Sequence, residues 1–142
     1  MPPSLPEDAL AALQSIKTQT LARGQIWWLP AKFVGYRGEP KGRYCLLIAV
    51  EKTPQGDVAQ VYFVAGTSKE ASGPAVVIEK GELTLGKRTE FDFSVAWAVP
   101  AEDVAEAGSF ITDLSARIGE IDKAVSDTRA TELIAVKRVL GR

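Results

Sequence analysis

The chain has 142 residues, 46% of them hydrophobic, and a formal net charge of −1, which fits one domain spanning 1–142 around a hydrophobic core. It has no histidine and one cysteine, Cys45, which excludes an intrachain disulfide, a Cys/His zinc site and histidine-dependent nucleophilic catalysis. Cys45 lies in an apolar run, where we expect a small buried thiol. The apolar runs are strand-sized and the N-terminus lacks the features of a signal peptide, so we expect a cytoplasmic protein with no membrane partner.

An N-terminal helix is predicted over 5–20. Ser4 and Glu7 have the spacing of a capping box, in which the two side chains satisfy free backbone N–H groups at the start of a helix. Apolar residues then recur at helical spacing, at Leu10, Leu13 and Ile16. Gly24 ends this segment, and the β region follows it.

Three β-strands are predicted next, at 26–29, 43–50 and 58–65. The second and third are rich in aliphatic and aromatic residues and are separated by a turn at 53–57 that contains proline and glycine, so we expect a hairpin. Neither strand alternates cleanly between apolar and polar residues, since 61–64 are all apolar, so we expect both faces to be covered. This pattern favours a small closed barrel.

Two further strands, at 75–79 and 91–99, complete a β region that spans 24–100. The first follows a Gly-Pro pair, which is typical of a turn. The second alternates in its first half and is then apolar throughout. The predicted fold class is therefore mainly β with helices (α+β).

The remaining part, 101–142, is predicted to hold short helical segments and a C-terminal helix. A helical turn is expected over 100–106. The segment 114–125 fits either a helix or, at its centre, a short final strand, and both interpretations stay open. The closing helix is predicted over 128–140, because apolar residues lie on one face and basic residues and a glycine follow.

A guanidinium and two hydroxyls are predicted to meet at strand ends. A glycine-rich basic loop leads through Arg43 into one strand, and Thr67 and Ser68 follow the next strand along the chain. This arrangement suits a phosphate group. Basic residues of the first long loop would form a local patch for nucleic acid, although a solvated loop explains the same charges: Lys32, Arg37, Lys41 and Arg43.

Three segments in this order resemble the MazF/PemK (Kid) family of toxin endoribonucleases. They are Arg23-Gly24-Gln25-Ile26-Trp27, Glu39 ahead of Gly42-Arg43 and an apolar strand, and Val64-x-x-Thr67-Ser68. The resemblance covers residues 23–80 best. It implies an SH3-like, bent antiparallel β-barrel with a C-terminal helix, usually as a homodimer. It also implies cleavage of single-stranded RNA at short sequence motifs without metal or cofactor, and inhibition by an antitoxin protein.

The resemblance places four catalytic residues on this chain. Arg43 takes the position of the loop arginine, Thr67 and Ser68 take the strand-end hydroxyls, and Asp92 takes the acidic position. A carboxylate can accept the proton of the ribose 2′-OH while a guanidinium stabilises the charge that develops on the phosphate. Attack by the 2′-OH would leave a 2′,3′-cyclic phosphate.

Residues for RNA binding are expected among the basic and aromatic side chains near these positions. Stacking of an unpaired base is assigned to Trp28, Phe33 or Tyr36, with packing in the barrel as the alternative for each. Basic RNA contacts are assigned to Lys32, Lys41 and Arg88. The expected partners are single-stranded RNA, an antitoxin and a second copy of the chain, with no direct DNA contact.

The chain also departs from the family pattern. Tyr44 stands where a proline is usual, and a second arginine is out of register, because Glu90 occupies its place and Arg88 lies two residues earlier. Thr67 and Ser68 also suit an ordinary strand-to-loop turn, and Asp92 an outward position in an alternating strand. The alternative function is therefore a non-catalytic SH3-like barrel that binds peptide or RNA.

Overall fold

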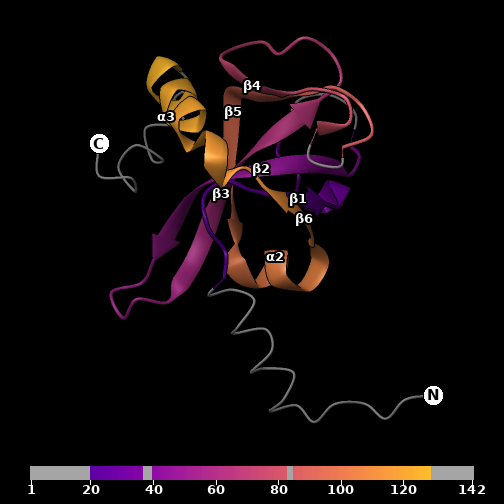
Figure 1. Cartoon of the computed structure of the whole chain (residues 1–142). Coiled ribbons are helices and arrows are strands. Elements are labelled where there is room, and N and C mark those ends of the chain that lie inside the picture. The colour runs from indigo at the N-terminus through magenta and orange to yellow at the C-terminus, as the bar shows by residue number, and fades with distance from the viewer. Residues whose placement is uncertain (1–19, 37–39, 83–84, 129–142) are drawn as a thin grey trace, which may run out of the picture.

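The computed structural model describes residues 20–36, 40–82 and 85–128. These residues form a mainly β fold, in which six antiparallel strands curl into a half-barrel (Figure 1). The strand order is β4-β5-β3-β2-β1-β6, so β4 and β6 lie at the two ends of the sheet. The strands are β1 (Gln25–Leu29), β2 (Arg43–Lys52), β3 (Val58–Thr67), β4 (Ala75–Ile78), β5 (Thr89–Pro100) and β6 (Ser109–Asp113).

The predicted hairpin is confirmed as β2 and β3, which pair antiparallel. Their turn is closed by a hydrogen bond of 2.7 Å from the Thr53 N–H to the Asp57 carbonyl oxygen. Gly56 has a φ of 90° in this turn, a conformation that favours glycine because it has no Cβ. Both strands are buried on both faces over most of their length, as their unbroken apolar runs predicted.

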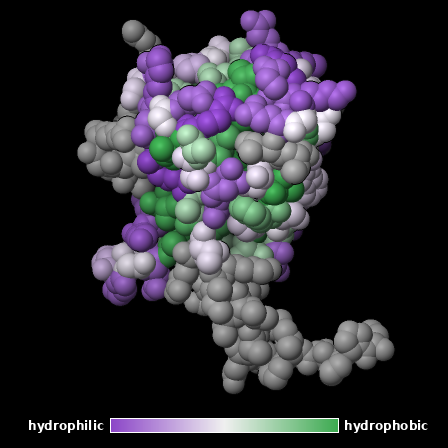
Figure 2. Space-filling view, in the orientation of Figure 1, coloured by the Kyte–Doolittle hydropathy of each residue, from purple (hydrophilic) through white to green (hydrophobic). Residues whose placement is uncertain are grey.

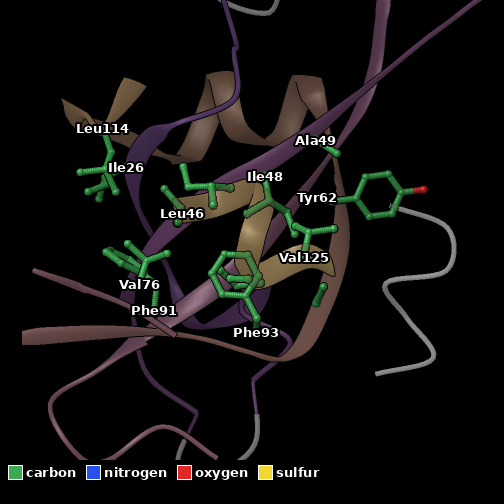
Figure 3. Close-up of a cluster of buried hydrophobic side chains, with 14 of the residues drawn as sticks. Ile26, Leu46, Ile48, Ala49, Tyr62, Val76, Phe91, Phe93, Leu114 and Val125 are labelled. Carbon is green, nitrogen blue, oxygen red and sulfur yellow. The ribbon is translucent and has the colours of Figure 1, made fainter. Parts of the chain in front are cut away.

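The two faces of the sheet carry separate hydrophobic clusters. Leu46 and Ile48 of β2 belong to the first cluster, and Cys45 and Leu47 to the second, because alternate residues of a strand point to opposite faces. Figure 3 shows the first cluster, in which the ring of Phe93 from β5 lies near the centre. Full burial of each large aliphatic or aromatic side chain stabilises the fold by about 1.5–3 kcal/mol.

Two α-helices cover these clusters from opposite faces. Helix α3 (Ile118–Asp127) contributes Ile121 and Val125 to the first cluster, as Figure 3 shows for Val125. Helix α2 (Ala101–Ala107) contributes Val104 to the second. On the face seen in Figure 2, hydrophilic residues gather at the upper end, over the loops beside β4, and hydrophobic residues are exposed below them.

Two arginines fasten α3 to the sheet. Arg23 donates through Nε to the carbonyl oxygen of Ile48 at 3.0 Å and through Nη2 to the Asp122 carboxylate. Arg117 donates to the carbonyl oxygen of Val77 at 2.8 Å and pairs with Glu82 at 3.2 Å. Since these ion pairs are partly exposed, each one adds only about 1 kcal/mol or less, and they mainly fix where the helix sits.

The other sequence predictions fall into three groups. The strands at 75–79 and 91–99 and the helical turn at 100–106 are confirmed as β4, β5 and α2. Of the two interpretations of 114–125, the helix is correct, since a 3-10 turn at Ser115–Arg117 leads into α3. The predicted helices 5–20 and 128–140 fall almost wholly outside the described residues.

Strand β6 was not predicted. It is five residues long, it pairs only with β1 within the described sheet, and all of its residues are exposed or half-buried. A short edge strand of this kind has neither the apolar run of a central strand nor a clean alternation. Within the same described ranges, no helix is long and apolar enough to cross a membrane.

Candidate functional site

A hollow of about 140 Å³ lies where β2 begins and β3 ends. The two ends meet because β2 and β3 are antiparallel, with Cys45 opposite Ala65, so the start of one strand borders the end of the other. We call this hollow the basic hollow. Its described lining residues are Trp28, Lys41, Gly42, Arg43, Tyr44, Gly66, Thr67, Ser68, Lys87 and Thr89.

The basic hollow brings together five of the site residues that the sequence singled out, Trp28, Lys41, Arg43, Thr67 and Ser68. It also contains Lys87, which the sequence analysis missed in favour of its neighbour Arg88. Among the described lining residues there are three cationic side chains and no carboxylate. Such a concave surface of one charge attracts anions.

Arg43 is held from two sides. Its guanidinium carbon lies 5.1 Å from the centre of the Tyr36 ring, within the range of a cation–π contact. One guanidinium N–H donates to the carbonyl oxygen of Gly66 at 3.3 Å. An arginine side chain has five N–H donors, and no other hydrogen bond joins it to the described residues. Donors therefore remain for an anion in the basic hollow.

Trp28 lines the basic hollow, together with a second aromatic residue, Tyr44. It is 39% exposed, and it lies directly against the backbone of Gly42. Phe33 instead packs against the second hydrophobic cluster, and its carbonyl oxygen accepts a hydrogen bond of 2.8 Å from the Trp97 indole. Of the three aromatic residues proposed for stacking, Trp28 alone lines the basic hollow, while the Tyr36 ring contacts Arg43.

The hydroxyls of Thr67 and Ser68 stand at the end of β3. Thr67 is largely buried, and its Oγ1 accepts a hydrogen bond of 3.1 Å from the Lys69 N–H, two residues along the chain. This local bond is typical of a strand-to-loop turn. It uses the hydroxyl only as an acceptor, so the Thr67 proton can still be donated to an anion. Ser68 is exposed at the rim.

Asp92 does not line the basic hollow. It is fully buried in β5, so the expectation of an outward position is wrong. Its carboxylate accepts hydrogen bonds from the Tyr36 hydroxyl at 2.6 Å, the Ser72 N–H at 3.0 Å and the Ser94 N–H at 2.9 Å. Burial raises the pKa of Asp92, but these hydrogen bonds outweigh it and hold the pKa below its ordinary value.

The last two predicted RNA contacts lie elsewhere. Lys32 sits over the ring of Phe33, 5.0 Å from its centre, beside a separate hollow. Arg88 forms ion pairs with Glu90 and, at 3.5 Å, with Glu79. The predicted patch residue Arg37 and the family-motif residue Glu39 fall outside the described residues.

The structure also bears on cysteine and metal chemistry. Cys45 is fully buried, as expected, and burial raises the pKa of its thiol far above the ordinary value, which disfavours the reactive thiolate. Among 20–36, 40–82 and 85–128, no three His, Cys, Asp or Glu side chains are grouped to hold a metal ion.

No protein-family model and no curated protein matches this chain. A function is therefore proposed from the residues of the basic hollow.

Proposed function

We propose that this chain binds single-stranded RNA in the basic hollow, with a backbone phosphate against Arg43 and a base stacked on Trp28. One observation carries the proposal. Three cations, the hydroxyl-bearing residues Thr67 and Ser68 and a half-exposed indole converge on a hollow whose described lining has no carboxylate. Arginine and lysine are the usual partners of phosphate, and stacking on an aromatic face contributes about 1–3 kcal/mol per base.

The dimensions of the site favour a single strand. A hollow of about 140 Å³ suits one phosphate group, and the base would lie beside it against Trp28. Trp28 stands at the rim, where an unstacked base can reach its exposed face. Bases in a duplex are stacked on each other and offer no such face.

Metal-independent cleavage by a toxin-type endoribonuclease is the second candidate. It is favoured by the position of Arg43 beside Thr67 and Ser68 on one hollow. In this reaction the ribose 2′-oxygen forms a bond to the adjacent phosphorus and the bond from phosphorus to the 5′-oxygen breaks. The products are a 2′,3′-cyclic phosphate and a 5′-hydroxyl, and the guanidinium stabilises the charge that develops on the phosphate.

Asp92 is poorly placed to be the base of that reaction. Its carboxylate is enclosed by Tyr36 and two backbone N–H groups, and its lowered pKa makes it a weak proton acceptor. The 2′-OH would therefore need a proton acceptor other than Asp92. For this reason RNA binding comes first in the proposal and cleavage second.

The proposal that the chain is a toxin likewise comes second to RNA binding. It includes an SH3-like barrel, a homodimer, a cytoplasmic location and an antitoxin protein that competes for the basic hollow. The curled antiparallel sheet is compatible with such a barrel. An antitoxin segment with acidic side chains would be drawn to Lys41, Arg43 and Lys87 by the same electrostatics as RNA.

The test compares wild-type protein with Arg43→Ala on a long single-stranded RNA, with EDTA present. Binding is followed by fluorescence anisotropy, and the ends of any fragments are mapped. Arg88→Ala is the matched control, because Arg88 lies outside the basic hollow. Binding that is lost in Arg43→Ala and kept in Arg88→Ala would support the site, and discrete cuts with cyclic phosphate ends would add catalysis. Equal binding by all three proteins would overturn the proposal.

A further inference from the structure

We infer that Asp92 and Tyr36 are positioning residues, which together hold the Arg43 guanidinium at the basic hollow. The RNA-binding test of this inference rests on the proposed function. The contacts that run from Asp92 through Tyr36 to Arg43 belong to the folded chain itself, with or without RNA. It gives Asp92 a role other than the acid or base that the family resemblance implies.

The support begins at a rigid position in the sheet. Asp92 lies in β5, opposite Ala65 of β3 on one side and Ala75 of β4 on the other. Because β5 is paired with a neighbouring strand on each side at this residue, the backbone that carries the carboxylate is held from both sides. Its burial then restricts the side chain further.

Tyr36 transmits this fixed position to Arg43. Its hydroxyl donates to Asp92 Oδ2 at 2.6 Å, and its ring lies 5.1 Å from the guanidinium carbon of Arg43. An arginine side chain has many rotamers, and a stacking surface reduces the number that it samples before it binds an anion. The hydrogen bond thus fixes the position of the Tyr36 ring, and the ring limits the positions that the Arg43 guanidinium can sample.

Asp92 also fastens the loop on the other side of the basic hollow. Its Oδ2 atom accepts a second hydrogen bond, of 3.0 Å, from the Ser72 N–H, in the loop that follows Ser68. The Ala71 N–H of the same loop donates to Glu90 at 3.2 Å. One buried carboxylate therefore joins two segments that flank the site, the one that carries Tyr36 and the one that carries Ser68.

The first test is a double-mutant cycle on RNA binding. Tyr36→Ala removes the ring, and we expect it to weaken binding of a fluorescein-labelled single-stranded RNA of mixed sequence about tenfold. It should also reduce the slope of log K against log salt by about one, because one phosphate contact is lost. In the Arg43→Ala background, Tyr36→Ala should have no further effect. Tyr36→Phe removes only the hydrogen bond to Asp92 and should weaken binding less than Tyr36→Ala does. Tyr62→Phe is its control, since Tyr62 belongs to the first hydrophobic cluster.

Additivity would overturn the inference. If Tyr36→Ala weakens binding equally with and without Arg43, the tyrosine acts on RNA independently of the arginine. A Tyr36→Ala protein with wild-type affinity and salt dependence would overturn it as well. The salt slope also distinguishes these outcomes from partial unfolding of the variant. Partial unfolding would lower the amount of protein that binds RNA, but the molecules that stay folded would keep the wild-type salt slope.

A second readout needs no RNA. In the wild type, the side-chain protons of Arg43 should show ring-current shifts in NMR spectra. Tyr36→Phe keeps the ring but loses the hydrogen bond to Asp92, so it should reduce these shifts, and Tyr36→Ala should remove them. Unshifted Arg43 protons in the wild type would overturn the support, whatever the protein binds. Shifted protons in a chain that binds no RNA would uphold the support and reject the proposed function.

Discussion

Trp28 lies so close to Gly42 that a Cβ atom added at Gly42 would be 2.1 Å from Cζ2 of the indole ring. No real pair of atoms tolerates this distance, so the ring must move when Gly42 is replaced. Glycine is therefore required here because it lets the indole rest against the backbone at the rim of the basic hollow.

Gly42→Ala should displace the Trp28 ring and weaken binding of single-stranded RNA by about three- to tenfold, since one stacking platform is lost. The indole is partly exposed and can swing outward, so the melting temperature should change little. Gly119→Ala is the matched control, because a Cβ there meets nothing within 4 Å. An affinity for Gly42→Ala equal to that of the wild type would show that no base stacks on Trp28.

Lys87→Ala should weaken RNA binding and reduce the salt slope by about one, because Lys87 lines the basic hollow and would neutralise one phosphate charge. Lys52→Ala makes the same change in charge at the far end of β2 from Arg43. Binding titrations at several salt concentrations give both quantities. If the salt slope of Lys87→Ala equals the salt slope of Lys52→Ala, Lys87 does not contact RNA phosphate in the basic hollow.

Asp92→Asn should lower the free energy of unfolding at neutral pH by about 1–3 kcal/mol, because a buried amide cannot accept all three hydrogen bonds that the carboxylate accepts. Asp57→Asn, on the exposed hairpin turn, should change it by about 0.5 kcal/mol or less. Denaturant titrations of both variants and the wild type provide the measurement. A neutral effect of Asp92→Asn would mean that the carboxylate does not hold its three partners in solution.

The same carboxylate predicts a pH dependence with a definite sign. Its pKa is lower in the folded chain than the ordinary value of about 4, so the folded state binds fewer protons than the unfolded state. The stability that Asp92 contributes is complete above about pH 5 and is lost as the pH falls through 4 and below. The gap between wild type and Asp92→Asn should therefore narrow in acid, and a gap that widens there would contradict the prediction.

The hairpin and half of the site could be predicted from the sequence because they depend on local patterns. The apolar runs of β2 and β3 and the turn between them fix an antiparallel pair, which puts Arg43 beside Thr67 and Ser68 wherever the rest of the chain goes. Lys87 could not be predicted in the same way. It lies in an irregular segment between β4 and β5, and its approach to the hollow depends on the tertiary path.

Asp92 shows a second limit of the sequence pattern. Polar residues that alternate with phenylalanines in a strand normally face solvent, and Phe91 and Phe93 flank it. Here the segment around Tyr36 and the loop around Ser72 cover that face, so Asp92 is buried too, while the two phenylalanines are buried in the first hydrophobic cluster on the other face. Nothing local to β5 encodes these two covering segments.

The packing of α3 predicts the cost of shortening one of its side chains. Ile121 is fully buried in the first hydrophobic cluster, so Ile121→Ala should lower the free energy of unfolding by about 2–5 kcal/mol through lost burial and the cavity left behind. Ile118 is only partly buried against the same cluster, and Ile118→Ala should cost clearly less. Because α3 lies on the sheet and does not line the basic hollow, RNA affinity of the folded protein should be unchanged in both variants. Equal costs for the two substitutions would mean that α3 packs with a different face against β4 and β5.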